Sequence, residues 1–457
     1  MTNLIVEISK YVMILLMAVY TYANFRYFSV RDEDRKRGIC RRQNAAMLAI
    51  HFLAYLVMYL SREDPDLRSR LAAFYCAQVV FFLCYTIFSH MIYRNISRIL
   101  VNNSCMLLCA GLIMLTRLSL DAGMERAIRQ FAIAAAAAAG AWLVPWVMER
   151  FWQLYRFQWV YAGAGLGILF LVFLVGNESF GAQLSLSFGE FSLQPSEFVK
   201  ISFVFFAASM FYQGVNFKRV AAATAIAAAH VIILVLSKDL GSALIFFATY
   251  LLMLFAATGN WLYLGSGLGL GAGASAAAYG LFGHVRRRVE AWRNPWADID
   301  NTGYQITQSL FAIGTGGWFG MGLCQGMPWR IPVVEKDFIF SAISEEMGGI
   351  FALCLLLICL GCFIQCMMTA ARMQAAFYKL IAFGLGVEYM IQVFLNVGGV
   401  TKFIPSTGVT LPLVSYGGSS LAATFLVFGI IQGLHIIKEN DEEELKEERR
   451  PNGKERA

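Results

Sequence analysis

Charged residues are scarce in this chain: only 15% of its 457 residues are Asp, Glu, Lys or Arg, whereas 58% are hydrophobic. A soluble domain of this length cannot bury so much apolar surface, so the composition excludes an ordinary soluble protein. The hydrophobic residues form repeated runs of about 20 residues, the length that a helix needs to cross the hydrocarbon core of a bilayer. Because these runs are continuous rather than alternating, they argue against an outer-membrane β-barrel.

Other functional classes lack their sequence signals. No soluble segment carries a basic stripe with interleaved aromatic residues, so we expect no nucleic-acid partner in spite of the net charge of +7. The glycine-rich stretch 314–326 lacks the Gly-Lys-Ser/Thr ending of a phosphate-binding P-loop. The five histidines show no metal-ligand spacing, and the Cys359-x-x-Cys362 pair lies inside an apolar run, where packing is its expected role.

The apolar runs predict an all-α, polytopic membrane protein with about 13 transmembrane helices. The fourth run has the weakest signal, because Asn102 and Asn103 lie near one end. The expected spans cover about 10–29, 44–61, 72–93, 99–117, 130–148, 157–176, 197–213, 219–236, 240–257, 261–282, 338–363, 378–396 and 413–436.

Positive charge gives the expected orientation. Seven Arg and Lys residues lie between positions 26 and 42, after the first span, and such clusters stay in the cytoplasm. Alternating the spans from there puts the N-terminus outside and the charged tail 438–457 in the cytoplasm, where we expect it to be solvated. Four connections then lie outside, at about 177–196, 237–239, 283–337 and 397–412. The third is long and rich in Trp and Gly, so we interpret it as an ordered outer cap over a cavity.

Charged residues gather on this predicted outer side. Cations beside carboxylates suit an anionic lipid-linked substrate, because Arg matches phosphate oxygens and a carboxylate can act as a general base. An ion-coupled transporter would use buried carboxylates as well. The candidates are Arg286, Arg287 and Arg288 at the start of the long loop, Asp298 and Asp300 after them, Glu197 and Lys200 on one helix face, Asp239 and Asp337 at the starts of spans, and Glu345 and Glu346 inside an apolar span.

Five blocks in the second half of the chain resemble, in order, the signatures of the SEDS family of bacterial cell-wall glycosyltransferases, which includes FtsW, RodA and SpoVE. The blocks are QPSE followed by Lys200, DLGSA at 239–243, NPWADIDNTGYQITQ at 294–308, DFIF with EEMG at 337–348, and PSTGVTLPLVSYGGSS at 405–420. One departure is Lys238, where the family usually has proline before its D-L-G block. Each block alone is a weak signal, but their order makes the resemblance specific.

The resemblance implies an enzyme that polymerises lipid II into glycan strands, beside a class B penicillin-binding protein. Asp298 matches the aspartate of the family's W-x-D motif and is by resemblance the catalytic residue, with Asp300 as the alternative. It would accept the proton of a sugar hydroxyl in an inverting transfer that releases undecaprenyl pyrophosphate. Cations or a divalent metal, Mg²⁺ or Mn²⁺, would stabilise this leaving group. The expected substrate-binding residues are Lys200, Glu197, Arg286, Arg287, Arg288, Lys402, Glu345, Glu346, Asp239 and Ser415.

The chain is longer than the family pattern. Residues 1–95 should hold about three extra N-terminal helices, and residues 96–437 the core of about ten spans with the outer loop at about 283–337. The extra helices are either a docking platform for a partner or a passive addition. Two other functions stay open: a lipid II flippase or related transporter, and a non-catalytic scaffold for a penicillin-binding protein. The sequence does not distinguish roles in division, elongation and sporulation.

Overall fold

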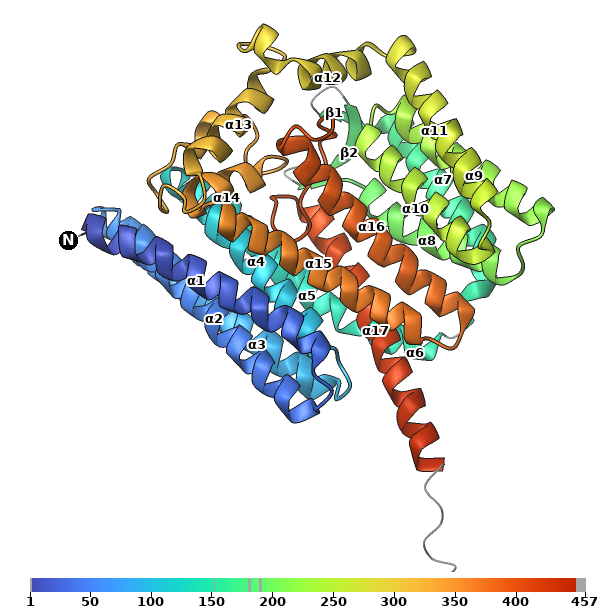
Figure 1. Ribbon diagram of the computed structural model, residues 1–457, viewed down its shortest axis with the longest axis horizontal. Coiled ribbons are helices and arrows are strands. Elements are labelled where there is room, and N and C mark those ends of the chain that lie inside the picture. Colours follow the sequence, from blue (N-terminus) through green and yellow to red (C-terminus); the bar gives the residue numbers. More distant parts are fainter. Residues whose placement is uncertain (1, 152, 180–181, 189–190, 449–457) are drawn as a thin grey trace, which may run out of the picture.

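The computed structural model describes residues 2–151, 153–179, 182–188 and 191–448 as a bundle of long helices (Figure 1). The prediction of an all-α polytopic membrane protein is confirmed, and eleven of the described helical segments are long and apolar enough to cross a membrane. The first half of the chain forms α1 Thr2–Ser29, α2 Glu33–Leu60, α3 Pro65–Ile92, α4 Arg98–Ser119, α5 Glu125–Ala141, α6 Leu143–Arg150, α7 Gln158–Val175, α8 Ser196–Tyr212 and α9 Phe217–Leu236.

The second half of the chain begins with two more long helices and ends with three. Two of the predicted spans fall outside the eleven: α8 has only 17 residues, and α11 is rich in glycine. The exact number of spans therefore stays a prediction. The remaining helices are α10 Leu240–Thr258, α11 Trp261–Leu281, α12 Gly283–Arg293, α13 Tyr304–Gly316, α14 Ile339–Met347, α15 Gly349–Arg372, α16 Ala376–Val400 and α17 Gly418–Glu448, with short 3-10 turns η1 Leu120–Ala122, η2 Leu154–Phe157, η3 Pro295–Asp298 and η4 Pro328–Arg330.

Helix α4 is the centre of the bundle. We expected it to be the weakest of the predicted spans, yet its mean hydropathy is 1.9 and its whole apolar window is buried inside the protein. Its asparagines explain the difference, because Asn102 donates to Gln43 of α2 and Asn103 donates to Asn24 of α1. Polar groups that face a neighbouring helix are satisfied by protein rather than exposed to lipid.

The first three helices lie together along one flank (Figure 1, blue). Helix α1 packs along α2 and α15, while α2 and α3 both contact α4. These helices are therefore attached to the central helix and not separated from the bundle by a linker.

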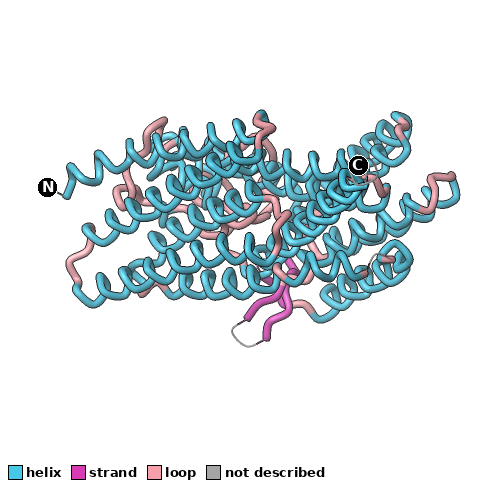
Figure 2. Tube along the Cα trace, turned by 90° about the horizontal axis from the view of Figure 1, so that it is seen from below, coloured by secondary structure: helices cyan, strands magenta, loops and turns pink. Residues whose placement is uncertain are grey.

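A small antiparallel sheet, which the sequence did not predict, lies in the connection after α7. Its strands are β1 Asn177–Ser179, β2 Ala182–Phe188 and β3 Phe191–Leu193, in the order β1-β2-β3. The sheet projects beyond the helices (Figure 2, magenta) and lies at the same end of the bundle as α12 (Figure 1).

Two late helices differ from their predicted spans. The span expected at 338–363 is broken at Gly348, whose positive φ of 91° ends α14 before α15 begins. Helix α17 continues as far as Glu448, so the first part of the charged tail is helical, and residues 449–457 lie outside the described part. The long connection 283–337 is ordered and contains α12, η3, α13 and η4.

Candidate functional site

A buried lysine is the centre of the main polar cluster. Lys200, on α8, is only 3% exposed, and its Nζ lies 2.8 Å from a carboxylate oxygen of Glu197 and 3.6 Å from one of Glu388. The same ammonium donates to the side-chain oxygen of Gln392 at 2.7 Å. Charges in the interior of a membrane protein persist only when they are paired in this way. Glu197 and Lys200, which were expected to share one helix face, form an ion pair with each other.

The two partners on α16 were not among the sequence-based candidates. Glu388, Gln392 and Asn396 recur every four residues, so they share one face of this helix. That spacing inside an apolar span was the signal available in the sequence. The α16 stripe joins Lys200 to the last sequence block, because the Gln392 amide donates to Thr410 and the Asn396 amide donates to the Val409 carbonyl.

Asp239 lies beside this cluster at the start of α10. One of its carboxylate oxygens accepts from the backbone N–H of Ser242 at 3.0 Å, which caps the helix, and the other accepts from Ser196 at 3.4 Å. Ser196 is the first residue of α8, so two predicted motifs, QPSE and DLGSA, meet here. The structure thus brings Glu197, Lys200 and Asp239 together, as three residues of one site.

An arginine links this buried cluster to the outer loop. Arg288 of α12 donates to the Thr407 carbonyl at 3.2 Å, and its guanidinium interacts with the carboxylates of Asp337 and Asp239. Burial lowers the pKa of Arg288, whereas the nearby carboxylates of Asp337 and Asp239 raise it. Burial also raises the pKa of Asp337 to about 6, with Lys336 and Arg288 opposing it. A line of charged groups therefore runs from α12 to Lys200.

Asp298 ends the short η3 turn on the outer loop. One carboxylate oxygen accepts from the Asn301 side chain at 2.9 Å, and the other accepts from the hydroxyl and the backbone N–H of Thr302 at 2.9 and 3.2 Å. These hydrogen bonds lower the pKa of Asp298, so the side chain is a carboxylate at neutral pH. Asp300, the alternative, is exposed two residues further on.

Four other predicted residues lie in different surroundings. Arg286 and Arg287 are exposed on α12, and Arg286 donates to the Gly280 carbonyl at 3.3 Å. Lys402 has a positive φ of 60°, and its carbonyl accepts from the indole of Trp292. The hydroxyl of Ser415 accepts from the Leu411 N–H at 2.8 Å, which indicates a role in the turn rather than contact with a ligand.

Glu345 and Glu346 make a second set of contacts, at the end of α14. Glu346 accepts from the guanidinium of Arg117 at 3.0 Å, and both side chains are almost fully buried. The other Glu346 oxygen accepts from the Cys324 N–H, and Glu345 accepts from the Met327 N–H. Glu346 therefore pairs with α4, and both glutamates anchor the loop before α14.

A divalent cation at the leaving group, named above as one possibility, stays a prediction. Within the described part of the chain, no group of three or more His, Cys, Asp or Glu side chains is arranged to hold a metal ion. We therefore assign no step of the reaction to a metal bound by protein side chains.

Fold and site together define a multi-pass helical membrane protein with a buried ion cluster that extends toward an ordered outer loop. Comparison with known proteins gives the family: residues 97–440 match the FtsW/RodA/SpoVE family of cell cycle proteins. The chain belongs to this family, which confirms the resemblance carried by the five sequence blocks.

Named relatives agree with this assignment. The chain is 35% identical over 346 residues to peptidoglycan glycosyltransferase RodA of Mycobacterium tuberculosis, covering 70% of this chain and 74% of that one. It is 35% identical over 273 residues to the probable peptidoglycan glycosyltransferase FtsW of Geobacter metallireducens, covering 58% and 73%. Among solved structures, a chain of a peptidoglycan synthase complex, described as coordinating polymerization and crosslinking, superposes with a TM-score of 0.64 at 25% identity, covering 75% of this chain and 98% of that one.

Proposed function

We propose that this protein is a peptidoglycan glycosyltransferase that polymerises lipid II into glycan strands at the outer face of the cytoplasmic membrane. Support comes from its family, from relatives named as peptidoglycan glycosyltransferases, and from the polar groups of the outer loop. The observation that carries the proposal is the ionised, solvent-accessible Asp298 at the end of the η3 turn, in the block that resembles the family's W-x-D motif.

Asp298 is the general base of the proposed reaction. Its carboxylate accepts the proton of the acceptor sugar's 4-hydroxyl, whose oxygen attacks the anomeric carbon of the lipid-linked donor while the bond to pyrophosphate breaks. A general base works best when its pKa is near the working pH. The hydrogen bonds from Asn301 and Thr302 lower the pKa of Asp298 and so make it a weaker base. Only one of these donors bonds to the first carboxylate oxygen, so the acceptor hydroxyl can approach that oxygen, and losing a donor on binding would raise the basicity of the carboxylate.

The arginines of α12 are the proposed contacts for the pyrophosphate. Arg286 and Arg287 are exposed beside the outer loop, where guanidinium groups can form paired hydrogen bonds with phosphate oxygens. Lys200 is enclosed by Glu197, Glu388 and Gln392, so its role is to hold the helices around the site together. Arg288 connects the two regions through Asp337 and Asp239.

Orientation and partners are part of the same proposal. We expect the N-terminus outside and the charged C-terminal tail in the cytoplasm, because the basic segment 26–42 should stay inside. A class B penicillin-binding protein is the expected partner, since a similar chain is found in a peptidoglycan synthase complex. The boundaries 1–95, 96–437 and 438–457 remain predictions for the accessory helices, the core and the tail.

The test separates the enzyme from the two alternatives. Purified full-length protein is mixed with lipid II in detergent, with and without its partner transpeptidase, and glycan strands are resolved on a gel. The same protein in vesicles is assayed for movement of lipid II between leaflets. Strands in the first assay support the polymerase, whereas movement without strands indicates a transporter. A negative result in both assays favours a scaffold.

A further inference from the structure

The break between α14 and α15 is closed by a segment of the outer loop. Backbone N–H groups of Met321 and Gly322 donate to the carbonyls of Glu345 and Glu346, and the N–H of Gly349 donates to the Gly317 carbonyl. Irregular backbone at membrane depth is stable only where such groups are paired within the protein. Residues 317–322, which we call the sealing segment, are therefore part of the wall of the bundle.

The accessory helix α1 covers the other side of the sealing segment. The ammonium of Lys10 donates to the Gly320 carbonyl at 3.4 Å and pairs with Glu7 at 2.7 Å. The ring of Tyr11 packs against Phe319, with 5.7 Å between their centroids. The sealing segment is thus held between α1 on one side and the α14–α15 break on the other.

The accessory helices are fixed to the core by buried polar contacts. Tyr20 of α1 donates to Asn103 of α4, and a chain of hydrogen bonds runs from His51 through Gln78 and Tyr55 to Thr116 of α4. Thr116 precedes Arg117, the residue that pairs with Glu346 at the break. Buried polar contacts between membrane helices hold them in one arrangement.

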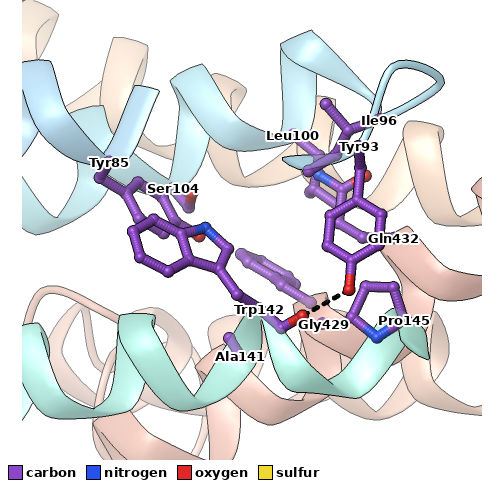
Figure 3. Close-up of a pocket in the computed structure, with 11 residues that line it drawn as sticks. Tyr85, Tyr93, Ile96, Leu100, Ser104, Ala141, Trp142, Pro145, Gly429 and Gln432 are labelled. Carbon is purple, nitrogen blue, oxygen red and sulfur yellow. Dashed lines mark hydrogen bonds between the residues drawn. The ribbon is translucent and has the colours of Figure 1, made fainter. Parts of the chain in front are cut away.

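A second attachment lies at the C-terminal end of α3 (Figure 3). The rings of Tyr85 and Trp142 stack with centroids 5.7 Å apart, and Tyr93 donates to the Trp142 carbonyl at 2.6 Å. The Trp142 indole donates in turn to Ser89. The first three helices therefore contact the core through α1, through α2 and through the C-terminal end of α3, which makes them a fixed support.

We propose that α1 is a brace for the outer loop, in which Lys10 and Tyr11 are positioning residues that act through the sealing segment on the Asp298 turn. The link is α13, whose 13 residues connect the two and span about 20 Å. A tilt of about 3° at one end of such a helix moves the other end by about 1 Å, enough to impair catalysis strongly. In this proposal the accessory helices are neither a passive addition nor only a docking platform for a partner. Their effect on catalysis depends on the proposed glycosyltransferase function.

The test uses the full-length protein and the aromatic contact. Tyr11→Ala, Phe319→Ala and the double variant are compared with Tyr11→Phe, which keeps the ring, and with Tyr22→Ala, a control on the same helix whose side chain is 66% exposed. Lipid II polymerisation is measured per folded molecule, together with hydrogen exchange of residues 317–322. We expect each alanine variant to lower kcat/KM about threefold to tenfold, the double variant to add little, and Tyr11→Phe to recover activity.

The exchange measurement keeps the brace separate from the enzyme proposal. Faster exchange of residues 317–322 in Tyr11→Ala, but not in Tyr22→Ala, supports the brace even if the wild-type protein makes no glycan. Unchanged exchange overturns the brace. Faster exchange with unchanged activity per folded molecule, or additive losses in the double variant, overturns the positioning role of Tyr11.

Discussion

The buried pair of Arg117 and Glu346 allows a stability prediction to be worked out from the structure. Their nitrogen and oxygen lie 3.0 Å apart, and the two side chains are 5% and 0% exposed. At that distance, with an effective dielectric constant of about 20, the attraction is about 5.5 kcal/mol. Removing one partner leaves the other charge buried without compensation, so Arg117→Met and Glu346→Gln should each lower the free energy of unfolding by about 3–5 kcal/mol.

The assay is equilibrium or thermal unfolding of the purified protein in detergent, applied to both single variants and the double variant. The double variant should lose less free energy of unfolding than the two single variants lose together, because no unpaired charge remains in it. Arg62→Met is the control. Arg62 pairs with Asp121, but the two side chains are 29% and 76% exposed, so this ion pair should contribute about 1 kcal/mol or less. If Arg117→Met is no more destabilising than Arg62→Met, the reasoning about the buried pair is refuted.

Three further changes test other parts of the account. Burial raises the pKa of Asp337 to about 6 in the folded protein. The protonated side chain therefore contributes its full stabilisation below about pH 4, and this stabilisation is lost as the pH rises through about 6. In unfolding midpoints, Asp337→Asn should therefore stabilise the protein more at about pH 8 than at about pH 4, and an equal effect at both would contradict this. Gly320→Ala should destabilise the protein by about 1–3 kcal/mol, because φ at this position is +75° and the new Cβ would lie 2.5 Å from the backbone carbonyl oxygen of Glu346. The control is Gly314→Ala on α13, where the new Cβ would have no atom within 4 Å, so this variant should not destabilise the protein in the same measurement. Lys200→Met should cost about 3–5 kcal/mol in unfolding experiments, and adding Glu388→Gln should recover part of this loss; no recovery would exclude Glu388 as a partner.

The sequence predicted most of the helices because the length of a hydrophobic run shows whether a helix can cross the hydrocarbon core of the membrane. It could not predict the break at Gly348, since the predicted span 338–363 runs through it and the break depends on hydrogen bonds from residues 317–322. The expectation that α4 is the weakest span was wrong, because its asparagines face neighbouring helices and its mean hydropathy of 1.9 is not the lowest among the spans.

The candidate site was predicted in part. Motif spacing identified Glu197, Lys200 and Asp239, which the structure brings together, but it could not identify Glu388 and Gln392, which approach from a helix almost 200 residues away. The charge of Glu345 and Glu346 was noticed in the sequence, whereas their partners on α4 and in the outer loop depend on tertiary packing. The contact of α1 with Phe319 and Gly320 likewise has no local sequence signal.

The central claim, that Asp298 is the base of a lipid II polymerase, has one direct test. Wild type, Asp298→Ala and Asp300→Ala are purified as folded full-length proteins, and the glycan strands made from lipid II in the presence of the partner transpeptidase are quantified. We expect strands from wild type and Asp300→Ala and none from Asp298→Ala. Equal polymerisation by wild type and Asp298→Ala would contradict it.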